Sequence, residues 1–348
     1  MGNPAKKNLT MDNERRPIDQ KRESGGQADI GSEADGAIVE MFNLNDRLLI
    51  VKERAVYELI LADSIDPNRE NFDLPTNIQR LVLNCGTESE LVCRSFLTAK
   101  RLFKEHYLLE TIDSNKILGL SLELTKELVA FNDEINEYLN DVKRAGSEYN
   151  TQIATKGSYA IPSITNLETQ CKTIFQKADH VTQALMEIVT VFFPEEKLNK
   201  QSHFPKLHEL LRSKFGENDK FVKFLGDSVK FLELIRSLRN CLDHRLPNVK
   251  VRDFELKPNS EILAPTIEID YRDSTLDRTN LENFLPIVKK NLMTVCEGVI
   301  ASLADKGTKA GKGIPNYVKF IPEDRRKNKY IQFSFWSPLG DGGFFDQQ

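Results

Sequence analysis

One run of apolar residues constrains the fold of this 348-residue chain more than any other feature. Large apolar side chains recur every three or four positions at Ile117, Leu120, Leu124, Leu128, Phe131, Ile135, Tyr138 and Val142. This spacing places them on one side of an α-helix of about seven turns. A seam so long and narrow fits a long core helix, which is the commoner case, or an antiparallel arm or a dimer contact.

A second amphipathic helix is predicted over residues 218–244. Its last residues, Arg239-Asn240-Cys241-Leu242-Asp243-His244, carry a guanidinium, an amide, a carboxylate and an imidazole. On a helical wheel the polar members of this segment and Arg236 lie opposite the apolar face, with Arg239 and His244 about 140° apart. We call these five residues (Arg236, Arg239, Asn240, Asp243 and His244) the polar stripe. Because the stripe lies off the core face, replacing Arg239 or His244 is expected to leave folding intact.

The polar stripe is either a solvated face or a functional site, and two details favour a site. From Arg236 to Arg252 the segment has a formal charge of +4, whereas the whole chain has −4. This local reversal predicts a phosphate-bearing partner. Pro247 is expected to end the helix and to leave His244 at the negative end of the helix dipole, which favours the protonated imidazole and suits acid–base work. The candidate phosphate-binding residues are Arg236, Arg245, Lys250 and Arg252.

The segment Arg239-Asn240-Cys241-Leu242-Asp243-His244, near the end of one long helix and followed by another, resembles the motif of the HEPN superfamily. We call it the Arg–His motif. The resemblance covers about residues 160–305 and implies a small α-helical domain. It also implies that Arg239 binds and stabilises the scissile phosphate of RNA, that His244 acts as general acid or base, and that Asn240 orients one of them. Catalytic members of the superfamily dimerise and need no metal, whereas other members do not cleave RNA.

The expected fold class is mainly α: a helical N-terminal region, then an HEPN-like antiparallel helical bundle with a β-hairpin insertion after the motif helix. By the resemblance, the expected function is a metal-independent endoribonuclease in stress response or defence. Its expected partners are RNA, a second copy in a homodimer and a protein regulator. No cofactor and no metal are expected. The alternative is a non-catalytic module that binds nucleotide, RNA or a protein.

Composition agrees with a folded intracellular protein. Charged residues make up 29% of the chain and hydrophobic residues 40%, as in soluble globular proteins. No apolar run approaches the length of a membrane span, and the first thirty residues are too polar for a secretory signal. The five cysteines are scattered and form no C-x-x-C pair. These features predict a reduced, cytoplasmic setting without membrane contact.

The order of domains follows from composition and periodicity. In the N-terminal region helices are expected at 76–84 and 88–108, and residues 48–61 form either a β-hairpin, which their β-branched content favours, or one helix. In the HEPN-like domain helices are expected at 163–193, 204–215 and 218–244. The expected parts are a disordered tail at 1–36, the N-terminal region at 37–145, a linker at 146–162, the HEPN-like domain at 163–305 and a basic linker with a strand-like extension at 306–348.

Smaller signals follow the motif helix. Residues 249–254 and 266–271 alternate in the strand period around the turn-prone 257–260, which predicts a hairpin beside the motif. Thr279 and Glu282 fit a capping box for a final helix that ends near residue 304.

Other candidate sites are weaker. The glycine-rich residues 307–313 lack the spacing of a phosphate-binding loop and are expected to be a linker. His203 and His208 lack the further ligands of a zinc site. Residues 330–336 contain the only Trp of the chain and follow a basic run, so they form either a base-stacking surface or, more commonly, a docked edge strand.

Overall fold

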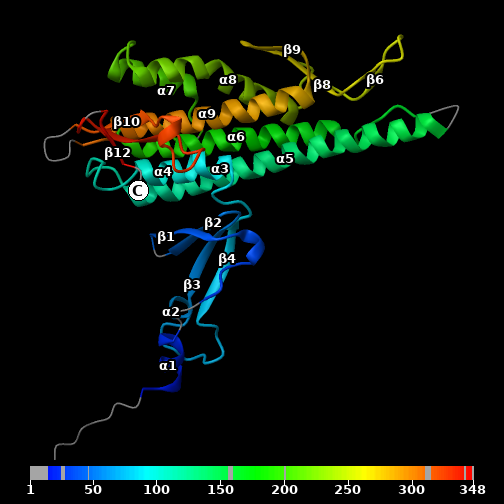
Figure 1. Ribbon diagram of the computed structural model, residues 1–348. Helices are drawn as coiled ribbons and strands as arrows, with labels where there is room; N and C mark the ends of the chain where they lie inside the picture. Colours follow the sequence, from blue (N-terminus) through cyan, green and yellow to red (C-terminus); the bar gives the residue numbers. More distant parts are fainter. Residues whose placement is uncertain are drawn as a thin grey trace, which may run out of the picture. The chain divides into compact units, whose positions relative to one another are not determined.

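The computed structural model describes residues 15–24, 28–45, 47–155, 160–199, 201–309, 315–340 and 342–346, with the backbone alone for 149–155. Contacts divide the chain into two compact units, Met1–Ser89 and Glu90–Gln348. Figure 1 labels the elements of both. Helix accounts for 49% of the structure and strand for 19%, so the fold is mixed α and β. The prediction of a mainly α chain, an all-α helical bundle, is therefore wrong.

The first unit is built on an antiparallel sheet with strand order β1-β2-β3-β4. The strands are β1 (Ile38–Leu44), β2 (Arg47–Lys52), β3 (Val56–Leu61) and β4 (Asn77–Leu83). Strands β2 and β3 form the hairpin that was one of the two interpretations of residues 48–61. The helix predicted at 76–84 is wrong, because this segment is β4 and pairs with β3. The N-terminal region is thus not helical throughout, because pairing with β3 decides the structure of residues 77–83.

Part of the predicted disordered tail is folded. Helix α1 (Pro17–Glu23) buries Ile18 and the side chain of Arg22, which forms an ion pair with Asp66 at 3.1 Å. Lys52 donates a hydrogen bond of 2.6 Å to the carbonyl of Ile30. These contacts give residues 15–24 and 28–36 partners that composition alone did not reveal, and residues 1–14 and 25–27 lie outside the described part. The unit also contains the 3₁₀ turn Glu33–Asp35 and helix α2 (Ala62–Ile65).

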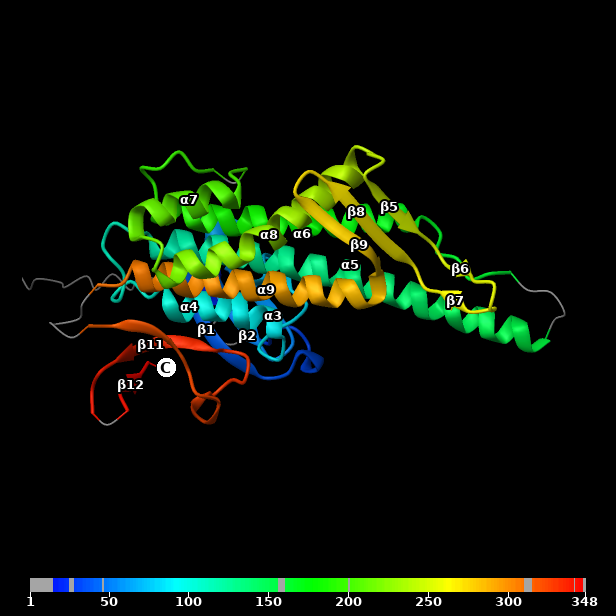
Figure 2. The same ribbon diagram turned by 90° about the horizontal axis from the view of Figure 1, so that it is seen from above.

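The second unit is organised around long helices that run side by side (Figures 1 and 2). Helix α5 packs on α6, α6 on α8, and α8 on α9, which also contacts α4 and α5. The helices are α3 (Glu90–Val92), continued by a π-helical turn (Cys93–Leu97) and α4 (Thr98–Leu102), then α5 (Ser114–Thr155), α6 (Leu167–Phe192), α7 (Phe204–Phe215), α8 (Lys220–Asp243) and α9 (Leu281–Lys306).

The apolar seam described first in the sequence lies on α5 and is buried against the neighbouring helices, apart from Leu120, which is half-buried. Phe131 is fully buried and Tyr138 is 1% exposed. The long-core-helix interpretation is therefore the observed one. Helix α5 continues to Thr155, through most of the predicted linker at 146–162, and the division between the units lies at Ser89 and Glu90 instead.

A three-stranded antiparallel sheet follows the motif helix, with order β5-β8-β9. The predicted hairpin supplies β5 (Val249–Arg252) and β8 (Thr266–Tyr271), and β9 (Ser274–Asn280) is a third strand that the sequence did not reveal. The turn-prone residues lie between the short strands β6 (Glu255–Leu256) and β7 (Ile262–Leu263). The predicted capping box is wrong: Thr279 belongs to β9, and the N-cap of α9 is Asn280, which accepts a 3.1 Å hydrogen bond from the backbone N–H of Asn283.

The C-terminal segment forms a small sheet with order β10-β11-β12. Figure 2 shows this sheet along one side of the helices. Its strands are β10 (Tyr317–Phe320), β11 (Phe333–Ser337) and β12 (Phe344–Phe345), with a 3₁₀ turn at Glu323–Arg325. Strand β11 contacts α4, and its Phe335 is 1% exposed. The aromatic segment is thus docked, although as a central strand and not an edge strand. Of the glycine-rich segment, residues 310–314 lie outside the described part. In the described residues no helix combines the length and apolar character needed to cross a membrane.

Candidate functional site

The C-terminal end of α8 carries the Arg–His motif. His244 is the C-cap, and Arg245 follows it in a left-handed conformation with φ of 51°. The N–H of Leu246 donates a hydrogen bond of 2.9 Å to the carbonyl of Cys241. The N–H of Arg245 donates a longer one, of 3.4 Å, to the carbonyl of Leu242. This pair of bonds is a Schellman motif, so the turn ends the helix before Pro247 is reached. The imidazole of His244 is left exposed to solvent at the helix end.

Arg239 is held by a buried carboxylate on the neighbouring helix α6. Its Nε and Nη2 donate to Oδ2 of Asp179 at 3.0 and 2.9 Å. Gln183 donates to the same oxygen at 2.7 Å. The side chain of Asp179 is only 5% exposed and that of Arg239 is 28% exposed. The guanidinium is therefore oriented from its inner side and remains open to solvent on its outer side.

Two further members of the polar stripe complete this network. Nη1 of Arg239 donates to Oδ1 of Asn240 at 2.9 Å and lies 3.7 Å from the carboxylate of Asp243. Asp243 accepts a 2.6 Å hydrogen bond from Gln176 and lies 3.5 Å from Nζ of Lys172, both on α6. Asn240 thus holds Arg239 and not His244, so its expected orienting role falls on the arginine.

The polar stripe was expected to face away from the core, and for two of its members this is wrong. Arg239 and Asp243 lie against α6, because α6 presents a buried carboxylate that needs a cation. Replacing Arg239 is therefore not neutral for folding, since it would leave Asp179 buried without its counter-charge. His244 is exposed, and for this residue the sequence expectation is unchanged.

The four candidate phosphate-binding residues divide into two groups. Arg252 makes two hydrogen bonds to Glu268 on β8, at 2.9 and 3.0 Å, and Nζ of Lys250 lies 3.2 Å from the same carboxylate. The hydrogen bond from Arg252 is the main reason why the pKa of Glu268 falls to about 2. Within the described ranges Arg236 and Arg245 form no ion pair. The formal charge of +4 was counted over residues 236–252 and did not include Glu268. In the folded protein the carboxylate of Glu268 neutralises part of that charge.

The donors of Arg239 decide what the site can do. A guanidinium has five N–H groups, and three are used by Asp179 and Asn240. One N–H on each terminal nitrogen is left, on a side chain that is still partly exposed, and this is the arrangement that binds a phosphate oxygen pair. The described residues contain no group of three or more His, Cys, Asp or Glu side chains able to hold a metal ion. The side chains of Arg239 and His244 are themselves suited to anion binding and proton transfer.

Asp179 is the residue that sequence reasoning missed. It stands among apolar residues of α6 that share its buried side, such as Phe175, Ala178 and Met186. A lone carboxylate on an apolar helix face is a signal by itself, because buried acids are almost always paired. The identity of its partner, 60 positions away, is not visible in the local pattern.

No family model, curated protein or solved structure matches this chain. Function is therefore inferred from the side chains at the end of α8 and from the motif that they form.

Proposed function

We propose that the second unit carries an HEPN-like site and cleaves RNA without a metal ion. The observation that supports this best is the pairing of Arg239 with the buried Asp179, since it fixes a guanidinium beside a helix end that exposes His244. A preorganised donor pair suits the charge that develops on phosphorus, and an imidazole exposed to solvent can accept or donate a proton. The expected setting is the cytoplasm, in stress response or defence, with a protein regulator as a further partner.

The proposed reaction uses the RNA's own 2′-hydroxyl. A base removes its proton, the 2′-oxygen attacks phosphorus, and the bond from phosphorus to the 5′-oxygen breaks as an acid protonates that oxygen. The products are a 2′,3′-cyclic phosphate and a free 5′-hydroxyl. Arg239 stabilises the negatively charged intermediate, His244 supplies one of the two proton transfers, and Asn240 holds Arg239 in place. Arg236 and Arg245 contact neighbouring phosphates, and Lys250 and Arg252 do so only by exchanging Glu268 for RNA.

This proposal is tested with purified protein and end-labelled RNA in the presence of EDTA. We expect cleavage that leaves cyclic phosphate ends, and a loss of at least about 100-fold in His244→Asn, which is what a positioned acid–base group contributes. His180→Asn is the matched control, because His180 is exposed on α6 and its imidazole faces Glu127 at 3.7 Å. Undiminished cleavage by His244→Asn, or activity that disappears with EDTA, would refute the assignment.

A homodimer is part of the proposal. Arg239 and His244 lie about 140° apart on an ideal helix, so one chain is poorly placed to bring both to one phosphate. A two-fold axis at the exposed end of α8 would place the His244 of one copy opposite the Arg239 of the other. Inactive Arg239→Lys and His244→Asn proteins should then regain part of the activity when mixed. A protein that cuts RNA while sedimenting as a monomer at micromolar concentration would disprove this arrangement.

The alternative is a module that binds RNA, a nucleotide or a protein without cleaving it. One observation favours it: Asp179 and Asp243 both lie against Arg239 and reduce the charge that it offers to a phosphate. Such a module would still bind RNA with an affinity that falls steeply as salt is added, and Arg236→Glu and Arg245→Glu would weaken it further. Salt-sensitive binding without any cleavage product would support this alternative over the nuclease.

A further inference from the structure

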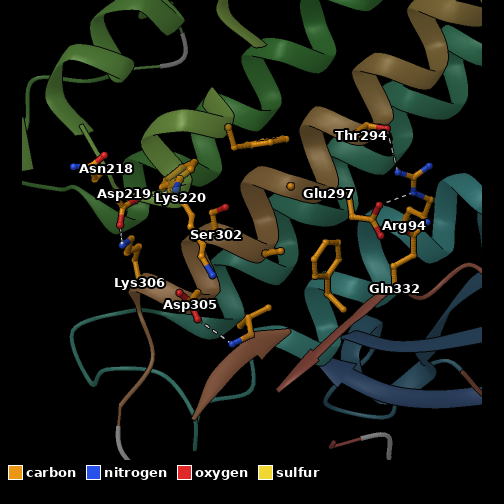
Figure 3. Close-up of a pocket in the computed structure, with 16 residues that line it drawn as sticks. Arg94, Asn218, Asp219, Lys220, Thr294, Glu297, Ser302, Asp305, Lys306 and Gln332 are labelled. Atoms are coloured by element: carbon orange, nitrogen blue, oxygen red, sulfur yellow. Dashed lines mark hydrogen bonds and ion pairs between the residues drawn. The ribbon is translucent and has the colours of Figure 1, made fainter. Parts of the chain in front are cut away.

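A second site lies at the opposite end of α8, within the same unit. A cavity of about 630 Å³, partly open to solvent, is lined by the π-helical turn that carries Arg94, the first turns of α8, the second half of α9 and strands β10 and β11 (Figure 3). This volume falls in the range of pockets that hold small molecules. None of its lining residues belongs to the Arg–His motif, so the proposed RNA site does not account for this cavity.

Aromatic and aliphatic side chains form much of the cavity wall. Phe224 and Phe333 line it and are only half-buried, and Val318 of β10 lies beside them in the lining. Gly298 on α9 allows this arrangement, since a Cβ at that position would lie 2.3 Å from the ring of Phe224. The wall therefore offers ring surfaces that a flat aromatic molecule could cover.

The polar end of the cavity contains a buried carboxylate with one unused oxygen. Glu297 is 2% exposed, and its Oε2 accepts a 2.6 Å hydrogen bond from Nε of Arg94. Figure 3 shows the two side chains facing each other, with Thr294 beside Arg94. Oε1 of Glu297 is buried without a hydrogen-bond partner among the described residues. A buried carboxylate oxygen left unsatisfied is costly, so it marks a place where a donor is missing.

The charges around the cavity are balanced. Three cations and three carboxylates line it, and two pairs of them, Arg94 with Glu297 and Asp219 with Lys306, are ion pairs. Asp305 is also occupied, since it accepts a 2.9 Å hydrogen bond from the backbone N–H of Val318. A lining without net charge does not favour the binding of a phosphate. In this respect the cavity differs from the proposed RNA site. It suits a neutral molecule.

We propose that this cavity binds a small neutral aromatic molecule that carries an N–H group. The ring lies against Phe224 and Phe333, and the side chain of Glu297 turns toward the cavity so that its buried Oε1 accepts a hydrogen bond from the N–H. Arg94 positions the carboxylate through the other oxygen, and Glu90 holds Arg94 from behind at 2.8 Å. The donor satisfies a buried acceptor of the cavity lining that the described residues leave without a partner.

Two ring systems of the same shape test the proposal: indole, which has the N–H, and benzothiophene, which has none. Titrations at about pH 8, above the raised pKa of Glu297, followed by ligand-observed NMR should show saturable binding of both, with indole bound about 10-fold more tightly, as expected of a hydrogen bond to a charged group. Ser302→Trp, which fills the cavity, should weaken both by at least about 10-fold. Lys290→Trp, on the exposed side of α9, is the matched control and should change neither.

Replacing the acceptor gives a second readout. In Glu297→Met, indole should lose its advantage over benzothiophene, while Arg94 keeps its ion pair with Glu90. If that variant does not fold, the ratio of the two affinities in the wild-type protein and the effect of Ser302→Trp still test the proposal. Equal affinities for the two rings in the wild type would mean that an ordered water alone serves Oε1. That result, or binding that Ser302→Trp leaves unchanged, would overturn the proposal.

Discussion

The second unit contains two buried carboxylates that each hold an arginine from another helical segment, and they differ in how completely they are satisfied. Oδ2 of Asp179 accepts two hydrogen bonds from Arg239 and one from Gln183. Glu297 accepts one from Arg94 and leaves Oε1 open. Arg239 is 28% exposed and Arg94 is 9% exposed. In the first pair the arginine is the more exposed partner, whereas in the second pair both side chains are buried.

The largest expected difference between the two pairs is in stability. Arg239→Ala leaves Asp179 buried with Gln183 as its remaining donor and should lower the free energy of unfolding by about 3 kcal/mol. Asp179→Leu combined with Arg239→Met removes both charges and should cost clearly less than the single change. Urea unfolding of these two variants and of the wild-type protein measures this difference. A loss below about 0.5 kcal/mol in Arg239→Ala would mean that the pair is not a buried ion pair in solution.

A smaller and pH-dependent effect is expected at Glu297. Burial raises its pKa from an ordinary 4.5 to about 7, although Arg94 and, more weakly, Arg326 lower it, and Glu90 raises it. An acid with a raised pKa binds its proton more tightly in the folded protein. Its stabilising contribution is therefore complete below pH 4.5 and is lost as the pH rises through about 7.

The wild-type protein should accordingly lose about 2 to 3 kcal/mol of stability between pH 4.5 and 7 that Glu297→Gln does not lose. The measurement is urea unfolding of both proteins at several pH values in that window. Parallel pH profiles for the two proteins would show that Glu297 titrates near its ordinary value. Burial would then not distinguish Glu297 from Asp179 in the way described above.

Periodic apolar residues predicted the elements of the second unit better than those of the first. The seam on α5 and the apolar face of α8 each depend on one helix, so they are visible in a local window. Strand β4 was predicted as a helix because its place in the sheet depends on pairing with β3. The third strand beside the motif, β9, was missed because it carries polar residues such as Asp277, Arg278 and Thr279.

The candidate site was predictable in part for the same reason. Arg239, Asn240 and His244 follow one another on a single helix and form a readable motif. Asp179 was not found, since its partner is 60 positions away, and Glu297 is 203 positions from Arg94. Each is a single acid among buried residues of a helix, which signals that a partner exists without saying which one. The partner of each acid is identified only by the packing of α6 on α8 and of α9 on the π-helical turn before α4.

The central claim is that the arginine paired with Asp179 serves RNA cleavage and the arginine paired with Glu297 does not. The most direct measurement compares the cleavage rates of Arg239→Lys and Arg94→Lys with labelled RNA in EDTA, at a temperature where both variants are folded. Lysine keeps the charge but loses the planar donor pair, so Arg239→Lys should be slower than the wild-type protein by at least about 100-fold. Arg94→Lys should cleave at the wild-type rate. Equal rates for the two variants, whether both fast or both slow, would contradict the account.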